Sequence, residues 1–199
     1  MTKGTNGSLY GTASAYGANY YGSVFKTSTD GQVTPVYTFN GTDGSVPTAP
    51  LVLGSDGKFY GTTSQGGASN KGEVFHLTAA GALVLLHSFT TSEGTAPSTG
   101  LVRGDDGNFF GTTYYGGASS YGTLFKITPA GQFTTLLSFD DYNGRFPSSD
   151  LVQGAGGNFY GTTRAGGASA QGTVFRLTPG GTLDHAGFLH RQQRGLSRF

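Results

Sequence analysis

Tyrosines gather in two glycine-rich loops of this 199-residue chain. A tyrosine ring is flat and apolar with a hydroxyl at its tip, so it suits stacking on a sugar or packing on a protein partner. Loops of the same type elsewhere in the chain carry Gln65 and Arg164 instead. The candidate ligand-binding residues for a glycan or protein are Tyr16, Tyr20, Tyr21, Tyr114, Tyr115 and Tyr121. The alternative is that these rings only pack on neighbouring parts of the fold.

Other chemistry-bearing residues form no convergent pattern. The chain has four histidines and no cysteine, and Glu73 is the one acid near His76 in sequence. A metal site or general base needs several partners, so we interpret His76 and His87 as surface or edge residues. We predict no catalytic residue, no metal and no cofactor.

Acidic residues recur between short apolar runs, as in Ser55-Asp56-Gly57 and Asp105-Asp106-Gly107. Calcium takes about six to eight oxygen ligands, and each of these loops offers one or two carboxylates. Asp-Gly pairs are typical of tight hairpins, so we expect turns here. A glycosidase needs two carboxylates roughly 5 to 10 Å apart, and no such pair stands out. A polysaccharide-active propeller enzyme, a glycosidase or lyase, is the alternative to a non-catalytic binding module.

A repeat of fifty residues positions all of these loops. Tyr10-Gly11-Thr12 recurs at Tyr60, Phe110 and Tyr160, and Phe25 recurs at Phe75, Phe125 and Phe175. Each unit has four short apolar or β-branched runs separated by Gly, Asp and Pro, which predicts four strands. Leu83, Leu85, His87 and Phe89 alternate with Val84, Leu86 and Ser88, so both faces of a sheet are partly apolar and need cover.

The repeat predicts an all-β fold of tandem four-stranded units, resembling four blades of a β-propeller in a closed ring or an open arc. We divide the single repeat domain, residues 1–182, into units 1–50, 51–100, 101–150 and 151–182. The first strand of unit 1 is expected to be weak, because Met1-Thr2-Lys3 replaces a Leu-Val pattern. Open sheet edges could pair with another copy of the chain.

The tail, residues 183–199, departs from the repeat, so unit 4 is expected to lack its last strand. Codons for Leu183 to Phe199 read one nucleotide later can restore the repeat pattern. We interpret the tail as a frameshift product, which the nucleotide sequence would test.

The composition of the chain limits the classes of partner that we expect. The chain has 12 Lys and Arg against 11 Asp and Glu, so no basic face for nucleic acid is expected. No run approaches the roughly 20 apolar residues of a membrane helix. The N-terminus lacks the apolar core of a signal peptide.

The repeated signature Phe59-Tyr60-Gly61-Thr62-Thr63, Gly66-Gly67 and Gly72-Glu73-Val74-Phe75, followed by Ser88-Phe89, Gly94 and Pro97, resembles the GloVer (Gloeo-Verruco) tandem repeat. The resemblance covers residues 4–182. It implies a propeller-like repeat protein of the choice-of-anchor type, secreted or at the bacterial cell surface, with no established activity. The sequence departs from the family in showing neither a leader nor an anchor, so export of this chain does not follow from the resemblance.

Overall fold

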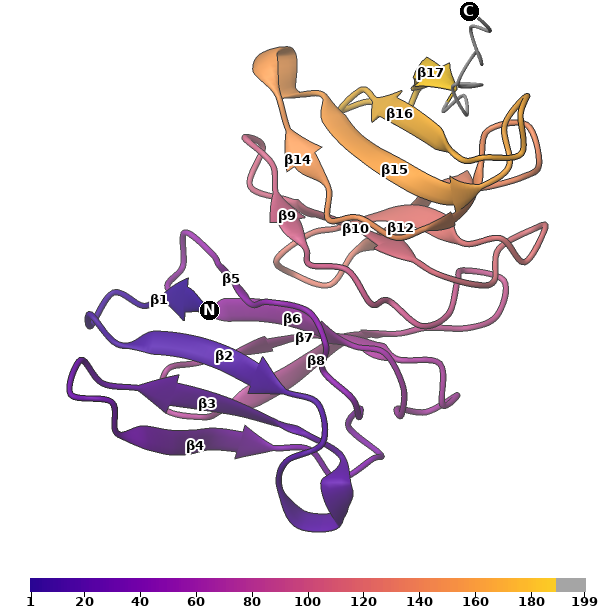
Figure 1. The fold of residues 1–199 in the computed structure, drawn as a ribbon. Helices are drawn as coiled ribbons and strands as arrows, with labels where there is room; N and C mark the ends of the chain where they lie inside the picture. Colours follow the sequence, from indigo (N-terminus) through magenta and orange to yellow (C-terminus); the bar gives the residue numbers. More distant parts are fainter. Residues whose placement is uncertain (189–199) are drawn as a thin grey trace, which may run out of the picture.

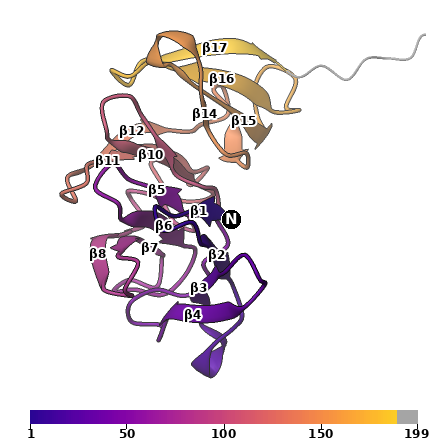
Figure 2. The same cartoon turned by 90° about the vertical axis from the view of Figure 1, so that its left-hand side faces the viewer.

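The structure is a computed structural model that describes residues 1–188. It holds four antiparallel sheets, one for each repeat unit, arranged in chain order along an open arc (Figures 1 and 2). Each short first strand lies at one edge of its sheet, and the chain then moves strand by strand to the other edge. The predicted all-β fold of tandem four-stranded, propeller-like units is confirmed, and the described sheets do not close into a ring.

Corresponding strands of the four units begin fifty residues apart. Unit 1 contains β1 (Thr2–Lys3), β2 (Leu9–Ala13), β3 (Ser23–Thr27) and β4 (Val33–Thr38). Unit 2 contains β5 (Val52–Leu53), β6 (Phe59–Thr63), β7 (Glu73–Leu77) and β8 (Leu83–Ser88). Unit 3 contains β9 (Val102–Arg103), β10 (Phe109–Thr113), β11 (Thr123–Ile127) and β12 (Phe133–Ser138). Unit 4 contains β14 (Val152–Gln153), β15 (Phe159–Ala165), β16 (Thr173–Leu177) and β17 (Leu183–Phe188).

Three short elements lie outside this scheme: β13 (Arg145–Pro147), η1 (Ala18–Tyr20) and η2 (Ala155–Gly157). Strand β13 belongs to the segment that crosses from unit 3 to unit 4, and it pairs with β15 of the following unit. Single bridges, Ser45 with Gln65 and Thr95 with Tyr115, do the same at the earlier crossings. Each crossing segment therefore ties two neighbouring sheets together.

Two expectations about the ends of the repeat are wrong. Strand β1 is as long as the other first strands and pairs with β2 through Thr2 and Tyr10. Unit 4 does have a fourth strand, because the backbone of β17 pairs with β16 in the register of the other units. Pairing of strands uses backbone groups, so a divergent sequence can still fill the place. The rest of the predicted tail, residues 189–199, lies outside the described residues, and its frameshift origin stays a prediction.

The strict alternation expected along β8 is also wrong. A register shift lies between Val74 and Phe75, where Val74 pairs with His87 and Phe75 pairs with Leu85. The extra residue on the outer strand is a β-bulge, which moves the following side chains to the other face. As a result Leu83 packs towards unit 1, whereas Phe89 packs towards unit 3.

The core consists of three layers, one between each pair of neighbouring sheets. We call the face of a sheet towards the preceding unit its leading face and the other its trailing face. A pair of aromatic rings crosses each layer: the centroids of Tyr10 and Phe59 are 4.1 Å apart, and those of Tyr60 and Phe109 are 3.9 Å apart, both stacked, whereas Phe110 and Phe159 are tilted at 4.1 Å.

Phe75, which lies on the leading face of unit 2, explains one glycine of the repeat. Gly61 pairs with Phe75 across β6 and β7, and a Cβ at Gly61 would lie 2.7 Å from the tip of that ring. The glycine in each Tyr-Gly-Thr or Phe-Gly-Thr sequence thus makes room for the buried ring on the next strand.

Candidate functional site

Three of the predicted tyrosines come together around one phenylalanine of the crossing segment. Tyr114 and Tyr115 directly follow β10, and Tyr121 ends the same loop just before β11. The loop turns back through Gly116 and Gly117, both at positive φ, a conformation that glycine adopts freely. The amide of Phe146 donates a 2.9 Å hydrogen bond to the carbonyl of Tyr121, which holds the crossing segment beside the loop.

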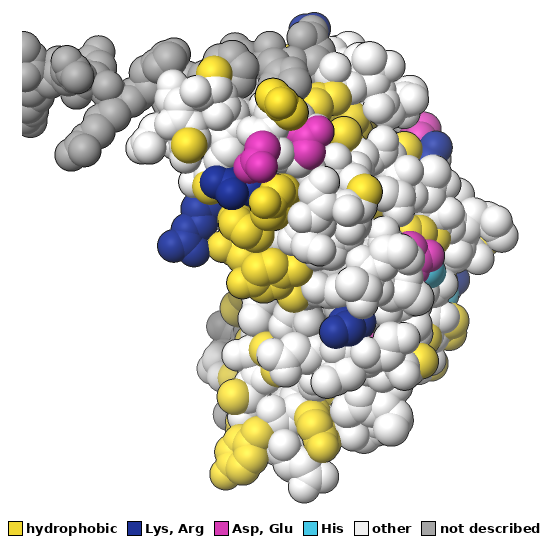
Figure 3. Space-filling model, turned by 90° about the vertical axis from the view of Figure 1, so that its right-hand side faces the viewer, with side chains coloured by type: hydrophobic (Ala, Val, Ile, Leu, Met, Phe, Trp, Pro, Cys, Tyr) yellow, Lys and Arg dark blue, Asp and Glu magenta, His cyan; other side chains and the backbone are white. Residues whose placement is uncertain are grey.

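The four rings form a continuous surface, which we call the aromatic patch: Tyr114, Tyr115, Tyr121 and Phe146. The ring centroid of Phe146 lies 5.3 Å from Tyr114, 5.7 Å from Tyr115 and 5.6 Å from Tyr121. The Tyr114 and Phe146 rings are nearly parallel, and the other two meet Phe146 edge to face, both favourable arrangements of aromatic rings. On the face in Figure 3, hydrophobic side chains gather beside basic and acidic ones where units 3 and 4 meet.

Charged groups border the aromatic patch. The Arg164 guanidinium donates to the Tyr114 hydroxyl at 3.0 Å, which links the patch to unit 4. Arg145 lies over the Tyr121 ring, 5.2 Å from its centroid, and its Nε is 3.2 Å from Asp141 Oδ1. These groups offer hydrogen-bond donors and acceptors at the edge of an apolar surface.

An open groove of about 580 Å³ continues from the patch between units 3 and 4. Its lining consists of Asp141, Tyr142, Arg145, Gly166, Gly167, Ala168 and Ala170. Tyr142 is 85% exposed and Tyr115 is 52% exposed, so aromatic surface is accessible both in the groove and in the aromatic patch. The arrangement can hold an extended polar ligand.

The other three predicted tyrosines are not brought together. Tyr16 lies beside Phe25 on the leading face of unit 1, and Tyr20 is 78% exposed. Tyr21 lies against Gly41 at a separate groove of about 550 Å³ between units 1 and 2. Tyr16, Tyr20 and Tyr21 therefore form no common surface, and ligand binding by any of the six tyrosines stays a prediction.

Five residues of the site were missed in the sequence: Asp141, Tyr142, Arg145, Phe146 and Arg164. The signal that could have found them is departure from the repeat, because the crossing segments of units 1 and 2 have Ser45-Val46 and Thr95-Ala96 in place of Arg145-Phe146.

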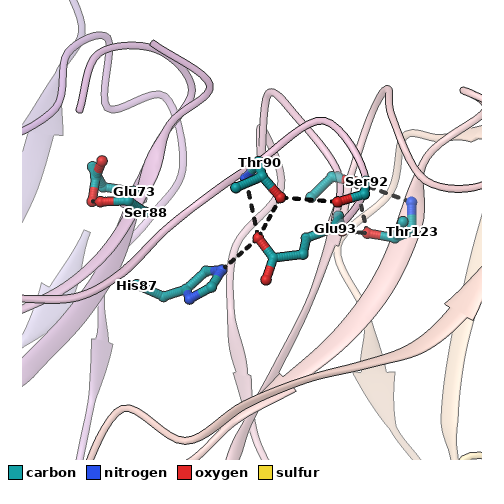
Figure 4. Close-up of polar contacts among 8 residues, drawn as sticks. Glu73, His87, Ser88, Thr90, Ser92, Glu93 and Thr123 are labelled. Atoms are coloured by element: carbon teal, nitrogen blue, oxygen red, sulfur yellow. Dashed lines mark hydrogen bonds and ion pairs between the residues drawn. The ribbon is translucent and has the colours of Figure 1, made fainter. Parts of the chain in front are cut away.

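A second polar cluster lies in unit 2, at the end of β8 (Figure 4). Glu93 Oε2 lies 3.3 Å from His87 Nε2 and accepts hydrogen bonds from the amide and hydroxyl of Thr90. The His87 ring is stacked on Phe133 with centroids 3.8 Å apart. Burial lowers the pKa of His87, while the nearby Glu93 carboxylate opposes that shift. We interpret this cluster as a structural contact that holds the loop closed. Asp43 in unit 1 and Asn143 in unit 3 accept the equivalent hydrogen bond, from the amide of the residue three positions earlier.

Glu73 is a fully buried acid near the same loop. Its Oε2 accepts a 2.7 Å hydrogen bond from the Ser88 hydroxyl, and its Oε1 is buried without a hydrogen-bond partner. Burial raises the pKa of Glu73. A Cβ at Gly67 would lie 1.4 Å from Oε1, so this carboxyl fills space that a glycine leaves open. His76 is likewise buried, at 8% exposed beside Tyr60, which corrects the expectation of a surface or edge residue.

The acidic loops between the first two strands are turns, as expected. Asp56 Oδ1 accepts from the amide of Lys58, Asp106 Oδ1 accepts from the amide of Asn108, and Gly57 and Gly107 have positive φ. Over residues 1–188, no three His, Asp or Glu side chains gather in a way that could hold a metal ion. Nor does that part of the chain contain a helix long and apolar enough to cross a membrane.

Several solved structures share the fold at low sequence identity. Virginiamycin B lyase from Staphylococcus aureus is 20% identical with a TM-score of 0.68, and the match covers 96% of this chain and 55% of that one. A putative 6-phosphogluconolactonase from Bacteroides uniformis is 15% identical with a TM-score of 0.57, over 90% and 53%. A gluconolactonase from Xanthomonas campestris is 14% identical with a TM-score of 0.54, over 82% and 54%.

These neighbours show the fold alone, and the chain spans about half of their length. No curated protein matches its sequence. The profile of the Gloeobacter/Verrucomicrobia repeat, in contrast, matches residues 1–191, which confirms the resemblance carried by the fifty-residue signature. The chain belongs to the Gloeobacter/Verrucomicrobia repeat family.

Proposed function

We propose that this protein is a non-catalytic repeat scaffold that binds a glycan through the aromatic patch and the adjoining groove of units 3 and 4. The observation that carries the proposal is the convergence of three loop tyrosines on Phe146, beside Arg145, Arg164 and an open groove. The scaffold belongs to a bacterial protein that acts outside the cell or at its surface, where polysaccharides are accessible.

The chemistry of the patch favours a sugar polymer over an apolar ligand. Aromatic rings cover the apolar face of a sugar, and charged groups at the edge exchange hydrogen bonds with its hydroxyls. Asp141 accepts, Arg145 and Arg164 donate, and the tyrosine hydroxyls do both. The groove is open, so an internal stretch of a long chain can lie along it.

The proposal is tested by affinity electrophoresis or a glycan array with the full chain and the variant Tyr115→Ala. We expect retardation by at least one polysaccharide, weakened about tenfold by Tyr115→Ala, which corresponds to about 1.4 kcal/mol. Tyr20→Ala is the matched control, because it removes an exposed tyrosine of unit 1 that lies outside the patch. Equal weakening by both variants, or no binding to any glycan, would refute the proposal.

Turnover of the same polysaccharides distinguishes the enzyme alternative. Asp141, the acid at the patch, is paired with Arg145, and Glu73 is fully buried in unit 2. Neither is part of a pair of free carboxylates of the kind that glycosidases use. We therefore expect no new reducing ends and no unsaturated products, and either product would favour the enzyme.

A further inference from the structure

The three interfaces between neighbouring units repeat the same contacts. In each, the ring of an aromatic residue of the second strand packs against the ring of a phenylalanine of the next unit. In each, a phenylalanine after the fourth strand also meets the ring of the next unit's third strand: Phe39 on Phe75, Phe89 on Phe125 and Phe139 on Phe175, at 5.2 to 5.3 Å. One interface therefore has a defined trailing side and a defined leading side.

The leading face of unit 1 carries this pattern without a described neighbour. Phe25 is partly exposed there, whereas its counterparts Phe75, Phe125 and Phe175 are 0% exposed. Leu9 is 40% exposed and Val33 is 64% exposed, although the residues at these places in units 2 to 4 are buried or half-buried. The face is apolar and uncovered by residues 1–188.

The leading face of unit 1 also contains a hollow. It measures about 310 Å³ and is lined by Ala13, Tyr16, Phe25, Val33 and Pro35. Phe25 and Val33 correspond to Phe75 and Leu83, which pack in the layer that holds Phe39 of the preceding unit. The hollow thus lies where a preceding unit would insert its side chains.

The trailing face of unit 4 likewise exposes residues that are buried at the same places in other units. Tyr160 and Val174 are partly exposed, whereas Tyr60 and Val74 are 0% exposed at the same places in unit 2. Val152 is 63% exposed, although Val52 and Val102 pack against the next unit's core. Tyr160 has an aromatic ring at the position that contacts the next unit in the three other interfaces. Leu9 of unit 1 stands in the place of Phe59 and would be its apolar partner.

We propose that the trailing face of unit 4 docks on the leading face of unit 1 of a second copy of this chain, head to tail. Two copies joined at both ends form a closed eight-unit ring with two equal interfaces. The chain spans 55% of the S. aureus lyase and 53% of the B. uniformis protein, so two copies together are slightly larger than one such fold.

The test is the molar mass of the full chain in solution, by light scattering after gel filtration and by native mass spectrometry. We expect a dimer, at twice the 20.5 kDa of one chain. Val33→Glu alters the leading face and Val152→Glu alters the trailing face, and each side chain is more than 60% exposed in one copy, so the single chain should still fold. Because both faces enter every head-to-tail interface, either substitution alone should give a monomer.

Ser119→Glu is the control, since it adds the same charge to an exposed loop of unit 3 and should leave the dimer intact. Circular dichroism of each variant verifies the β fold. A wild-type chain that stays monomeric at all concentrations would overturn the proposal. So would a dimer that survives Val152→Glu but not Val33→Glu, because it would join two leading faces.

Discussion

At the scale of single residues, Glu73 stands where units 3 and 4 have one member of a buried hydroxyl pair. In units 3 and 4 the hydroxyls of Thr113 and Thr123, and of Thr163 and Thr173, lie 2.9 and 3.0 Å apart, fully or almost fully buried. Glu73 takes the place of Thr123 and leaves one carboxyl oxygen buried without a partner. A charged carboxylate is costly in such a site, so burial raises the pKa of Glu73, although hydrogen bonds from the Ser88 hydroxyl and the Ala68 amide oppose the shift.

This position makes folding stability depend on pH. Because the folded-state pKa of Glu73 is raised, its contribution is fully present below the ordinary pKa near 4.5 and is lost as pH rises through the raised value. Glu73→Gln keeps the shape and cannot ionise. We expect the variant to match the parent near pH 4 and to become more stable than the parent as the pH rises above that value.

Urea unfolding across this pH range measures the effect. The control is Asp105→Asn, which removes an exposed carboxylate of a hairpin turn. A stability difference between Glu73→Gln and the parent that does not change with pH would contradict this account.

At the scale of elements, the unit of stability is the layer between two sheets. Each layer joins an aromatic residue of one unit to phenylalanines of the next, so no sheet buries its core alone. In such linear arrays, a defect falls mainly on one unit and its two interfaces.

Phe75 tests this view of the layers. Phe75→Ala removes a ring that is 0% exposed and packed against Phe39 and Gly61, and we expect a loss of about 3 to 5 kcal/mol. Phe25→Ala is the matched control at the same repeat position, where the ring is already partly exposed, so its cost should be clearly smaller. Chemical denaturation of both variants measures this, provided each is monomeric under the conditions used. Equal losses of unfolding free energy in the two variants would show that the unit covering Phe75 adds nothing to its contribution to stability.

At the scale of the whole molecule, the four units form an arc whose inner layers are complete and whose two end faces are not (Figure 1). Repeat proteins gain stability with each interface added. The stability of this chain should therefore depend on the number of its units rather than on any one of them.

Deletion of unit 4, residues 151–199, tests that dependence. It would expose Phe110, Leu124 and Phe139, which are 0% exposed in the full arc. Covering such side chains stabilises by about 1.5 to 3 kcal/mol each, so the shortened chain should melt at a temperature lower by roughly 10 °C or more. Thermal denaturation followed by circular dichroism gives the measurement. A melting temperature equal to that of the full chain would mean that the units are stable independently.

The sequence by itself determined the repeat, the four strands of each unit and the turns between them. These features depend on neighbours within one unit: Asp-Gly and Asn-Gly pairs select hairpins, and apolar runs of five or six residues select strands. It also determined the residues of the core, since Phe75 and Tyr60 recur at fixed places and are buried wherever a neighbour covers them.

Tertiary structure decided what lies on which face and what meets across units. A bulge after Leu85 moves the side chains in the later part of β8 to the opposite faces of the sheet. The alternating pattern of the sequence does not reveal such an extra residue. Backbone pairing built β17 from a sequence that had left the repeat. Tyr114, Phe146 and Arg164 come from separate segments, and they converge because β13 pairs with β15 and draws unit 4 against unit 3. Tyr16, Tyr20 and Tyr21 lie in the corresponding loop of unit 1 but lack a central ring, because the crossing segment there has Val46 in the place of Phe146 although the backbone contact to Tyr21 is the same.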